Sequence, residues 1–253
     1  GFKTEGGKSY YYKNGKKVKG WLTLNRKKYY FNASTGVQVK GWAKDSKGKR
    51  YFYNANGAKG YMATGWLTDS KNNTRYFNPA SGYMTTKWAT ISNKKYYFYS
   101  GNGVAAKSTF LTDSKNVTRY FTSKCFMATG WATTSTAKKR YFDPSTGAMY
   151  TGFRKIGSYT YYFYKSKKSK GIMATGWVSN ITSGVKYYFD PSTGVMATGT
   201  KTIDGVQYTF SSSGVLQSSG SNPNTTTPSS SRTIKNFLAN ALKPDALCMG
   251  RWT

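Results

Sequence analysis

A repeat of 21 to 24 residues runs through most of this chain and limits what it can fold into. An aromatic anchor, usually a Trp preceded by Gly, recurs eight times at this spacing. The anchors are Trp21, Trp42, Trp66, Trp88, Phe110, Trp131, Phe153 and Trp177. A Tyr-Phe pair follows each anchor, at Tyr30-Phe31, Tyr51-Phe52, Tyr76-Phe77, Tyr97-Phe98, Tyr120-Phe121, Tyr141-Phe142, Tyr162-Phe163 and Tyr188-Phe189. Two features that keep the same step predict a repeat protein in which each unit packs on its neighbours.

Each unit has the pattern of a short β-hairpin. Residues 65–68 read Gly-Trp-Leu-Thr, the polar segment 69–73 follows, and Tyr76-Phe77 lies on the expected returning strand. Trp, Tyr, Phe and Thr suit half-buried strands, whereas Asp, Asn, Ser, Pro and Gly suit tight turns. A lone hairpin is marginal in water, so each unit must bury its aromatic residues against the next. We therefore expect an all-β solenoid of stacked hairpins over residues 1–217.

The composition changes after residue 217. Residues 218–231 are rich in Ser, Thr, Pro, Asn and Gly, which is typical of a linker. Residues 233–242 then have apolar side chains at helical spacing and end before Pro244. We expect a linker over 218–231 and, over 232–253, a short helical segment that begins a further, truncated domain.

The residue types present exclude most catalytic chemistry. The chain has no His, which removes Ser-His-Asp and Cys-His nucleophile pairs and His-ligated zinc sites. Glycoside hydrolysis needs two placed carboxylates, but the 8 acidic residues are scattered. Asp69, Asp113, Asp143 and Asp190 all have turn positions, and Cys125 stands where other units have a turn Gly. We expect no enzyme activity, no metal and no cofactor in this chain.

The charge of the chain points to an anionic partner. Lys and Arg number 39 against 8 Asp and Glu, a formal net charge of +31, whose self-repulsion opposes folding. The basic residues recur beside the Tyr-Phe pairs, so the expected partner is a polyanion with a repeat of its own. Nucleic acid is a rival polyanion, but the sequence has no recognition helix, zinc finger or RNA-binding motif. No apolar run approaches the roughly 18 residues that span a bilayer, so we expect no membrane insertion.

Units such as Met173-Ala174-Thr175-Gly176-Trp177, followed by Tyr188-Phe189, resemble the cell-wall-binding repeat of Gram-positive surface proteins. This superfamily includes choline-binding modules, glucan-binding repeats of glucosyltransferases and the repeats of large clostridial toxins. The resemblance covers residues 1–217 and implies a hairpin solenoid that anchors secreted proteins to surface glycans or wall polymers. In choline-binding members, it implies that aromatic side chains of neighbouring hairpins cage a quaternary ammonium group.

The sequence departs from the choline-binding pattern at one strand position. That pattern begins its strand with Trp-Tyr-Tyr, and the Trp is a wall of the cage. Aligned on the Tyr-Phe pair, the equivalent residues are Lys28, Lys49, Thr74, Lys95, Thr118, Lys139, Thr160 and Lys186. The next column reads Tyr29, Arg50, Arg75, Tyr96, Arg119, Arg140, Tyr161 and Tyr187. Because a Lys beside a cage repels a cation, choline is not the expected ligand, and the glucan-binding and toxin branches look closer.

Two sets of residues are candidates for binding. The anchors and their partner tyrosines could form the solenoid core, stack on sugar rings, or do both with opposite faces. The glycan-stacking candidates are Trp21, Trp42, Trp66, Trp88, Trp131, Trp177, Tyr30, Tyr51, Tyr76, Tyr97, Tyr141 and Tyr188. The anion-binding candidates are Lys49, Arg50, Arg75, Lys95, Arg119, Lys139 and Arg140.

These features predict a non-catalytic, secreted, wall-associated module that binds a cell-wall polymer such as a teichoic acid, or an anionic glycan, and anchors a parent protein. Two alternatives remain. The chain could be the targeting half of a wall hydrolase whose catalytic domain follows residue 253. It could also be an adhesin that binds anionic host glycans.

Overall fold

The computed structural model describes residues 1–54, 60–134, 137–179 and 184–220. These residues form short antiparallel strands. No helix occurs among them, and so there is no helix that could span a membrane. Eight two-stranded sheets lie between a three-stranded sheet at each end of the described chain. The predicted fold, a succession of β-hairpins, is confirmed.

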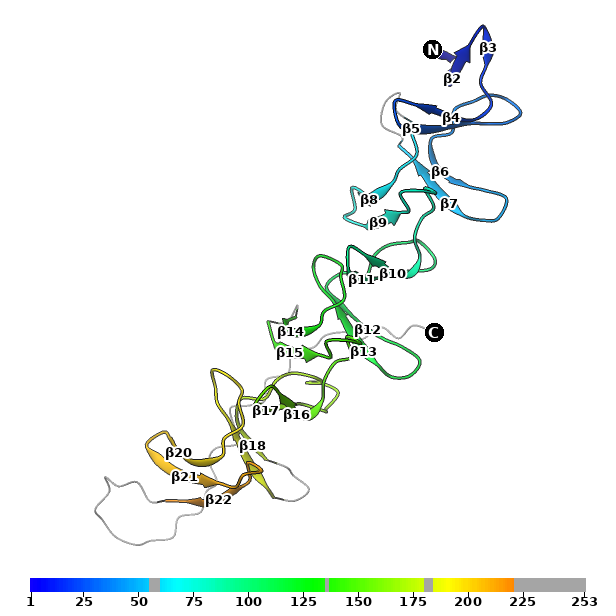
Figure 1. Cartoon of the computed structure of the whole chain (residues 1–253). Helices are drawn as coiled ribbons and strands as arrows, with labels where there is room; N and C mark the ends of the chain where they lie inside the picture. The colour runs from blue at the N-terminus through cyan, green and yellow to red at the C-terminus, as the bar shows by residue number, and fades with distance from the viewer. Residues whose placement is uncertain (55–59, 135–136, 180–183, 221–253) are drawn as a thin grey trace. The chain divides into compact units, whose positions relative to one another are not determined.

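The strands follow one another along the chain in hairpin pairs (Figure 1). The first half contains β1 (Phe2–Glu5), β2 (Lys8–Lys13), β3 (Lys16–Lys17), β4 (Gly20–Leu24), β5 (Lys27–Phe31), β6 (Gly41–Lys44), β7 (Arg50–Tyr53), β8 (Gly65–Thr68), β9 (Thr74–Phe77), β10 (Lys87–Ile91) and β11 (Lys94–Phe98). The second half contains β12 (Thr109–Thr112), β13 (Thr118–Phe121), β14 (Gly130–Thr133), β15 (Lys139–Phe142), β16 (Gly152–Ile156), β17 (Tyr159–Phe163), β18 (Gly176–Ser179), β19 (Lys186–Phe189), β20 (Gly199–Ile203), β21 (Val206–Phe210) and β22 (Leu216–Ser219).

The chain divides into two compact units. The first comprises Gly1–Gly176 and Phe189–Met196, and the second comprises Trp177–Tyr188 and Ala197–Thr253.

One register rule governs the hairpins. The residue before the anchor, usually Gly, lies opposite the last aromatic residue of the returning strand, and the anchor lies opposite the residue before that. In the β8–β9 hairpin, Gly65 pairs with Phe77 and Trp66 pairs with Tyr76. Because neighbouring strand residues point to opposite faces, this register puts the anchor and the last aromatic residue on different sides of the hairpin.

The last aromatic residue of each hairpin forms the core. This position is almost fully buried in every repeat, at Phe31, Tyr53, Phe77, Phe98, Phe121, Phe142, Phe163 and Phe189. Burying one such side chain contributes about 1.5–3 kcal/mol. One buried aromatic ring in each hairpin therefore takes the place of the aliphatic core of an ordinary globular domain.

Backbone hydrogen bonds tie each repeat to the one before it. The amide N–H of Met62, in the loop after β7, donates to the carbonyl of Lys28 in β5 at 2.7 Å. The same bond joins Met84 to Arg50, and Met127 to Lys95. The methionine that precedes five of the eight anchors by four residues therefore belongs to the loop that links successive hairpins.

The methionine side chain explains the turn glycine of the next repeat. Met62 packs against Gly82, so that a Cβ at Gly82 would collide with the Met62 side chain. Gly82 also has a φ of +71°, which other residues rarely adopt. Gly103, Gly147, Gly171 and Gly194 lie in the same way against Met84, Met127, Met149 and Met173.

The β6–β7 hairpin corrects one expected alignment. Trp42 lies opposite Phe52 and Gly41 opposite Tyr53, so the pair equivalent to Tyr76-Phe77 is Phe52-Tyr53 and not Tyr51-Phe52. The strand position that the sequence alignment assigned to Lys49 is therefore occupied by Arg50, and the position assigned to Arg50 is occupied by Tyr51. Residues 51–53 read Tyr-Phe-Tyr, which fits either alignment until the strand pairing is known.

The predictions for the C-terminal part are not tested. Strand β22 extends to Ser219, and the rest of the expected linker, the expected helical segment over 232–253 and Cys248 lie outside the described residues. The proposed division into domains stays a prediction.

Candidate functional site

The anchor tryptophans are exposed aromatic surfaces that recur from hairpin to hairpin. The anchor tryptophans are 41–52% exposed, although they are large and apolar. Five of the partner tyrosines, namely Tyr30, Tyr76, Tyr97, Tyr141 and Tyr188, are half-buried. Tyr51 is buried and pairs with Ala43 rather than Trp42, so the structure brings Phe52 and not Tyr51 to the anchor. Sequence reasoning missed Phe52.

Besides the buried last aromatic residue of the following hairpin, an anchor meets the residue two positions before it, and that residue is of two kinds. At the first kind of junction it is a Tyr. The Trp66 ring lies 4.9 Å from the Tyr96 ring in the next hairpin, at an angle of 57° between their planes. Trp131 meets Tyr161 in the same way, and within the second unit Trp177 meets Tyr208. The phenol rings of Tyr96 and Tyr161 are buried and that of Tyr208 is half-buried, and each lies against its anchor ring.

At the second kind of junction the residue is an Arg. The guanidinium carbon of Arg75 lies 5.3 Å from the Trp42 ring centroid, and that of Arg119 lies 5.7 Å from Trp88. Arg140 lies 5.0 Å from the ring of Phe110. Cations over aromatic faces attract the ring electrons, so each Arg stabilises its anchor while adding positive charge beside it.

Hydrogen bonds within the fold orient Arg75 and Arg119. Arg75 Nη1 donates to Asp69 Oδ2 at 2.8 Å, and its Nε donates to the carbonyl of Asn102 at 2.9 Å. Arg119 makes the equivalent bonds to Asp113 Oδ2 and to the carbonyl of Thr146. The Arg75 guanidinium holds the pKa of the Asp69 carboxyl well below its usual range. Arg119 likewise lowers the pKa of Asp113.

Arg140 has a different environment from the other two. It is buried, with 7% of its surface exposed, and it donates to the Thr134 hydroxyl and to the carbonyl of Lys170. Burial lowers the pKa of its guanidinium, because desolvation disfavours the charged form. Of the candidate anion-binding residues, Arg140 is the least accessible to an external ligand.

A second cation stands beside two of the Arg junctions. Arg50 Nη1 donates to the carbonyl of Gly101 at 2.6 Å, next to the Asn102 carbonyl that holds Arg75. Lys95 Nζ reaches the carbonyl of Ser145 at 3.5 Å, next to Thr146. In the corrected register, Arg50 and Lys95 occupy the same strand position.

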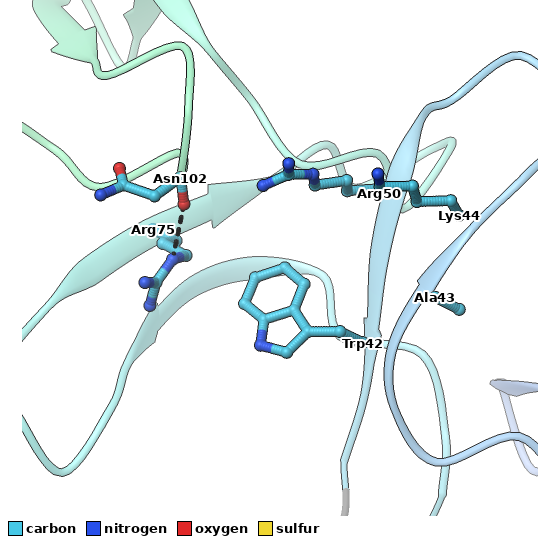
Figure 2. A pocket seen from close by; sticks show the side chains of 6 residues that line it. All are labelled: Trp42, Ala43, Lys44, Arg50, Arg75 and Asn102. Atoms are coloured by element: carbon cyan, nitrogen blue, oxygen red, sulfur yellow. Dashed lines mark hydrogen bonds between the residues drawn. The ribbon is translucent and has the colours of Figure 1, made fainter.

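These residues enclose two grooves of equivalent construction. The groove at Trp42 has a volume of about 390 Å³ and is lined by Trp42, Ala43, Lys44, Arg50, Arg75 and Asn102 (Figure 2). The groove at Trp88 has a volume of about 480 Å³, and Trp88, Lys95 and Arg119 line it together with Ser145, Thr146 and Asp113, the carboxylate that pairs with Arg119. Figure 2 shows the Trp42 indole between the side chains of Arg75 and Arg50. Sequence reasoning missed Lys44 and Asn102.

The remaining candidate cations lie outside these grooves. Lys49 is exposed, and its Nζ lies 5.9 Å from the ring of Tyr83. Lys139 is exposed on β15, in the hairpin of Trp131, whose junction is of the tyrosine kind. Cys125 is buried in a cluster with Ala105, and burial raises the pKa of its thiol. Among the described residues, no three His, Cys, Asp or Glu side chains gather as metal ligands would.

The geometry defines a class of protein, a β-hairpin repeat module that presents aromatic faces and cations to a ligand. Residues 18–59, 112–151 and 150–200 match the family model of the choline-binding repeat, and residues 86–105 match that of a putative cell wall binding repeat. The first model covers more than half of the chain, which therefore belongs to the choline-binding repeat family. It is a cell-wall-binding module, and repeats of this family are non-catalytic.

Solved structures from Streptococcus pneumoniae have the same fold. CbpJ is 24% identical, with 86% of this chain and 94% of that chain covered and a TM-score of 0.55. Choline binding protein F, solved in the presence of a peptidoglycan analogue, is 22% identical over 85% and 92%, with a TM-score of 0.53. The modular autolysin LytC is 26% identical over 86% of this chain and 46% of that chain, with a TM-score of 0.53. No curated protein sequence matches the chain.

Proposed function

We propose that the chain is the wall-binding module of a secreted protein and attaches this parent to an anionic wall polymer, a teichoic acid or an acidic glycan. The observation that carries the proposal is the exposure of the anchor tryptophans, 41–52%, together with the cations beside Trp42 and Trp88. Large apolar side chains that are exposed at the same position of successive hairpins mark a binding surface, because a folded protein otherwise buries most of them.

The two components of this surface suit two parts of a wall polymer. Aromatic faces stack on the apolar faces of sugar rings, and such stacking contacts resemble the base stacking worth about 1–3 kcal/mol each. Cations along the repeats neutralise phosphate or carboxylate groups and release counterions. The net charge of +31 attracts a polyanion from a distance at low salt.

Choline cages are not part of this proposal. In the corrected register, the strand position that carries a cage Trp in the choline-binding pattern holds Lys28, Arg50, Thr74, Lys95, Thr118, Lys139, Thr160 and Lys186. None of these side chains is aromatic, and five are cations that would repel a quaternary ammonium group in the low-dielectric space of a cage.

Co-sedimentation with purified Gram-positive walls tests the proposal. The chain should sediment with intact walls at near-physiological salt, lose this binding when the walls are stripped of teichoic acid and acidic glycan, and resist elution by free choline. Binding to mucin is measured in parallel, because an adhesin for host glycans should prefer mucin to bacterial walls. Unchanged binding to stripped walls, elution by choline, or a preference for mucin would each contradict the proposal.

A second candidate is the targeting half of a wall hydrolase. The similarity to LytC supports it, because this chain matches about half of a modular autolysin. If the parent protein is a hydrolase, its full-length form should clear walls in a zymogram, while this chain alone should bind walls without degrading them. A full-length parent that binds walls and leaves them intact would contradict this candidate.

A further inference from the structure

We propose that the grooves at Trp42 and Trp88 each bind one sugar residue that carries an anionic substituent, with the sugar ring against the indole and the anion between two cations. This inference rests on the proposed function, because it names the ligand class and the two sites for the same polymer. It applies to these two junctions and to none of the other junctions among the described residues.

The two grooves share one construction at corresponding positions. Each has an anchor Trp, a cation seven or eight residues later on the returning strand, and an Arg from the next hairpin. In each, the two cations reach adjacent carbonyls of one turn, Gly101 and Asn102 in the first groove and Ser145 and Thr146 in the second. The turn therefore holds both cations near the indole.

The cations keep donors for a ligand. A guanidinium has five N–H donors, and the bonds described for Arg75, to Asp69 and to the Asn102 carbonyl, use two of them. Asp69 and Asp113 compensate the charges of Arg75 and Arg119. Among the described residues, neither Arg50 nor Lys95 forms an ion pair with a carboxylate. Their charges are therefore available to an anionic ligand.

The aromatic part of each groove is accessible. Trp42 is 50% and Trp88 49% exposed, so half of each indole is open beside the two cations. A neutral polysaccharide would leave the cations without partners, and a simple inorganic anion would leave the indole uncovered. A sugar with a carboxylate or phosphate group would cover the indole and also pair with the cations, since Arg binds either group through paired N–H bonds.

The other junctions lack one or more of these parts. The Trp66 junction has Tyr96 instead of Arg and Thr74 instead of the second cation. The Phe110 junction has a buried Arg140, and Thr118 occupies the position of the second cation. The anionic sugar sites therefore number two among the described junctions.

Calorimetric titration of the full chain tests the inference. The probes are glycosylated poly(ribitol phosphate) fragments, a uronic acid oligosaccharide and a neutral glucan oligosaccharide. We expect two binding sites per chain for at least one of the two anionic probes. Tighter binding of the poly(ribitol phosphate) fragments would indicate a phosphate ligand, and tighter binding of the uronic acid oligosaccharide would indicate a carboxylate ligand. The variant with Arg50→Gln and Lys95→Gln should lose at least about tenfold in affinity, as expected when hydrogen bonds to charged groups are removed.

The matched control is the variant with Lys71→Gln and Lys115→Gln, which removes the same charge from exposed turn positions. It should change affinity by less than about threefold at physiological salt, because neither lysine lines a groove. A second groove variant, Arg75→Tyr with Arg119→Tyr, converts both grooves to the junction kind of Trp66 and should also abolish the two sites. Circular dichroism checks the fold of each variant.

The outcomes separate this inference from the proposed function. If the chain sediments with walls but the groove and control variants lose affinity equally, or the neutral probe binds as tightly as the anionic ones, the grooves are not the sites. If the unmodified chain binds neither walls nor any probe, the proposed function itself fails.

Discussion

The buried side chain of Cys125 packs in one cluster with Ala105, where the equivalent places in neighbouring repeats hold a Gly and a Met. In those repeats the methionine fills the space above the glycine, as Met62 does over Gly82. A smaller residue at 105 thus accompanies a larger one at 125, and the volume stays nearly constant. Cys125 keeps the positive φ of the glycine position, at +67°.

This exchange predicts strong coupling between Ala105 and Cys125. Ala105→Met alone should destabilise the fold by overpacking against Cys125, and Cys125→Gly alone should leave a cavity. The double variant restores the arrangement of Met62 and Gly82. Urea unfolding of the four proteins should give a favourable coupling free energy of about 1–3 kcal/mol. Additive effects of the two substitutions would show that the residues do not share one space.

A pair of glycine substitutions separates backbone strain from packing. Gly65 and Gly82 both have positive φ, but only Gly82 has a side chain, that of Met62, where a Cβ would lie. Gly65→Ala should cost about 1–2 kcal/mol, the usual cost of a left-handed conformation. Gly82→Ala should cost more, and Met62→Ala in the same chain should reduce the difference. Equal costs for the two substitutions would contradict the close approach of Met62.

Binding and stability should depend on opposite faces of the same hairpins. Phe98 is fully buried, so Phe98→Ala should lower the free energy of unfolding by about 3–5 kcal/mol. Trp66 is 43% exposed and contacts Tyr96, so Trp66→Ala should cost less, about 1–3 kcal/mol from partial burial and ring contacts. Thermal unfolding measures both. A loss at Trp66 as large as that at Phe98 would mean that the anchor is mainly a core residue.

Turn carboxylates should make the fold sensitive to acid. Hydrogen bonds from Ser192 and Thr193 lower the pKa of Asp190 to about 2, and similar bonds from Ser145 and Thr146 lower that of Asp143. A lowered pKa means that the ionised form stabilises the fold. This contribution is complete above about pH 4, the value for an unfolded Asp, and is lost as the pH falls through the folded value.

We therefore expect the midpoint of thermal unfolding to fall between pH 4 and pH 2. Asn32 and Asn78 fill the same turn position without a charge and accept the same backbone bonds. Replacing Asp143 and Asp190 by Asn should keep the turns and flatten this fall. A pH dependence unchanged by both substitutions would assign the acid sensitivity to other groups.

The hairpin fold could be predicted from the sequence because its signals are local and repeated. The spacing of the Gly-Trp and Tyr-Phe features, with turn residues between them, was sufficient to predict the strands and turns. The register at residues 51–53 could not be predicted in the same way, since Tyr51 and Tyr53 flank Phe52 symmetrically. One signal could have resolved it, because Tyr51 follows Asp45 by six residues as Arg75 follows Asp69.

The candidate site could be predicted only in part. Exposure of the anchors was one of two open alternatives, and it depends on how consecutive hairpins pack. Arg50, Arg75 and Arg140 looked alike as basic residues beside aromatic pairs. The structure gives them three environments. Arg75 pairs with Asp69 and Arg140 bonds to Thr134, each six residues upstream, whereas Arg50 occupies the strand position before theirs and bonds to the carbonyl of Gly101 in a later repeat. The contacts with the loop of a later repeat leave no local pattern.

The dependence of affinity on salt tests the central claim, binding of an anionic wall polymer beside the anchor tryptophans, most directly. The measurement is the association constant of the chain for isolated wall polymer between about 0.05 and 0.5 M salt, with and without free choline. The account predicts a steep linear fall of log K with log salt, because cations such as Arg50 and Lys95 release counterions from the polymer, and no effect of choline. Binding that is insensitive to salt and abolished by free choline would contradict it.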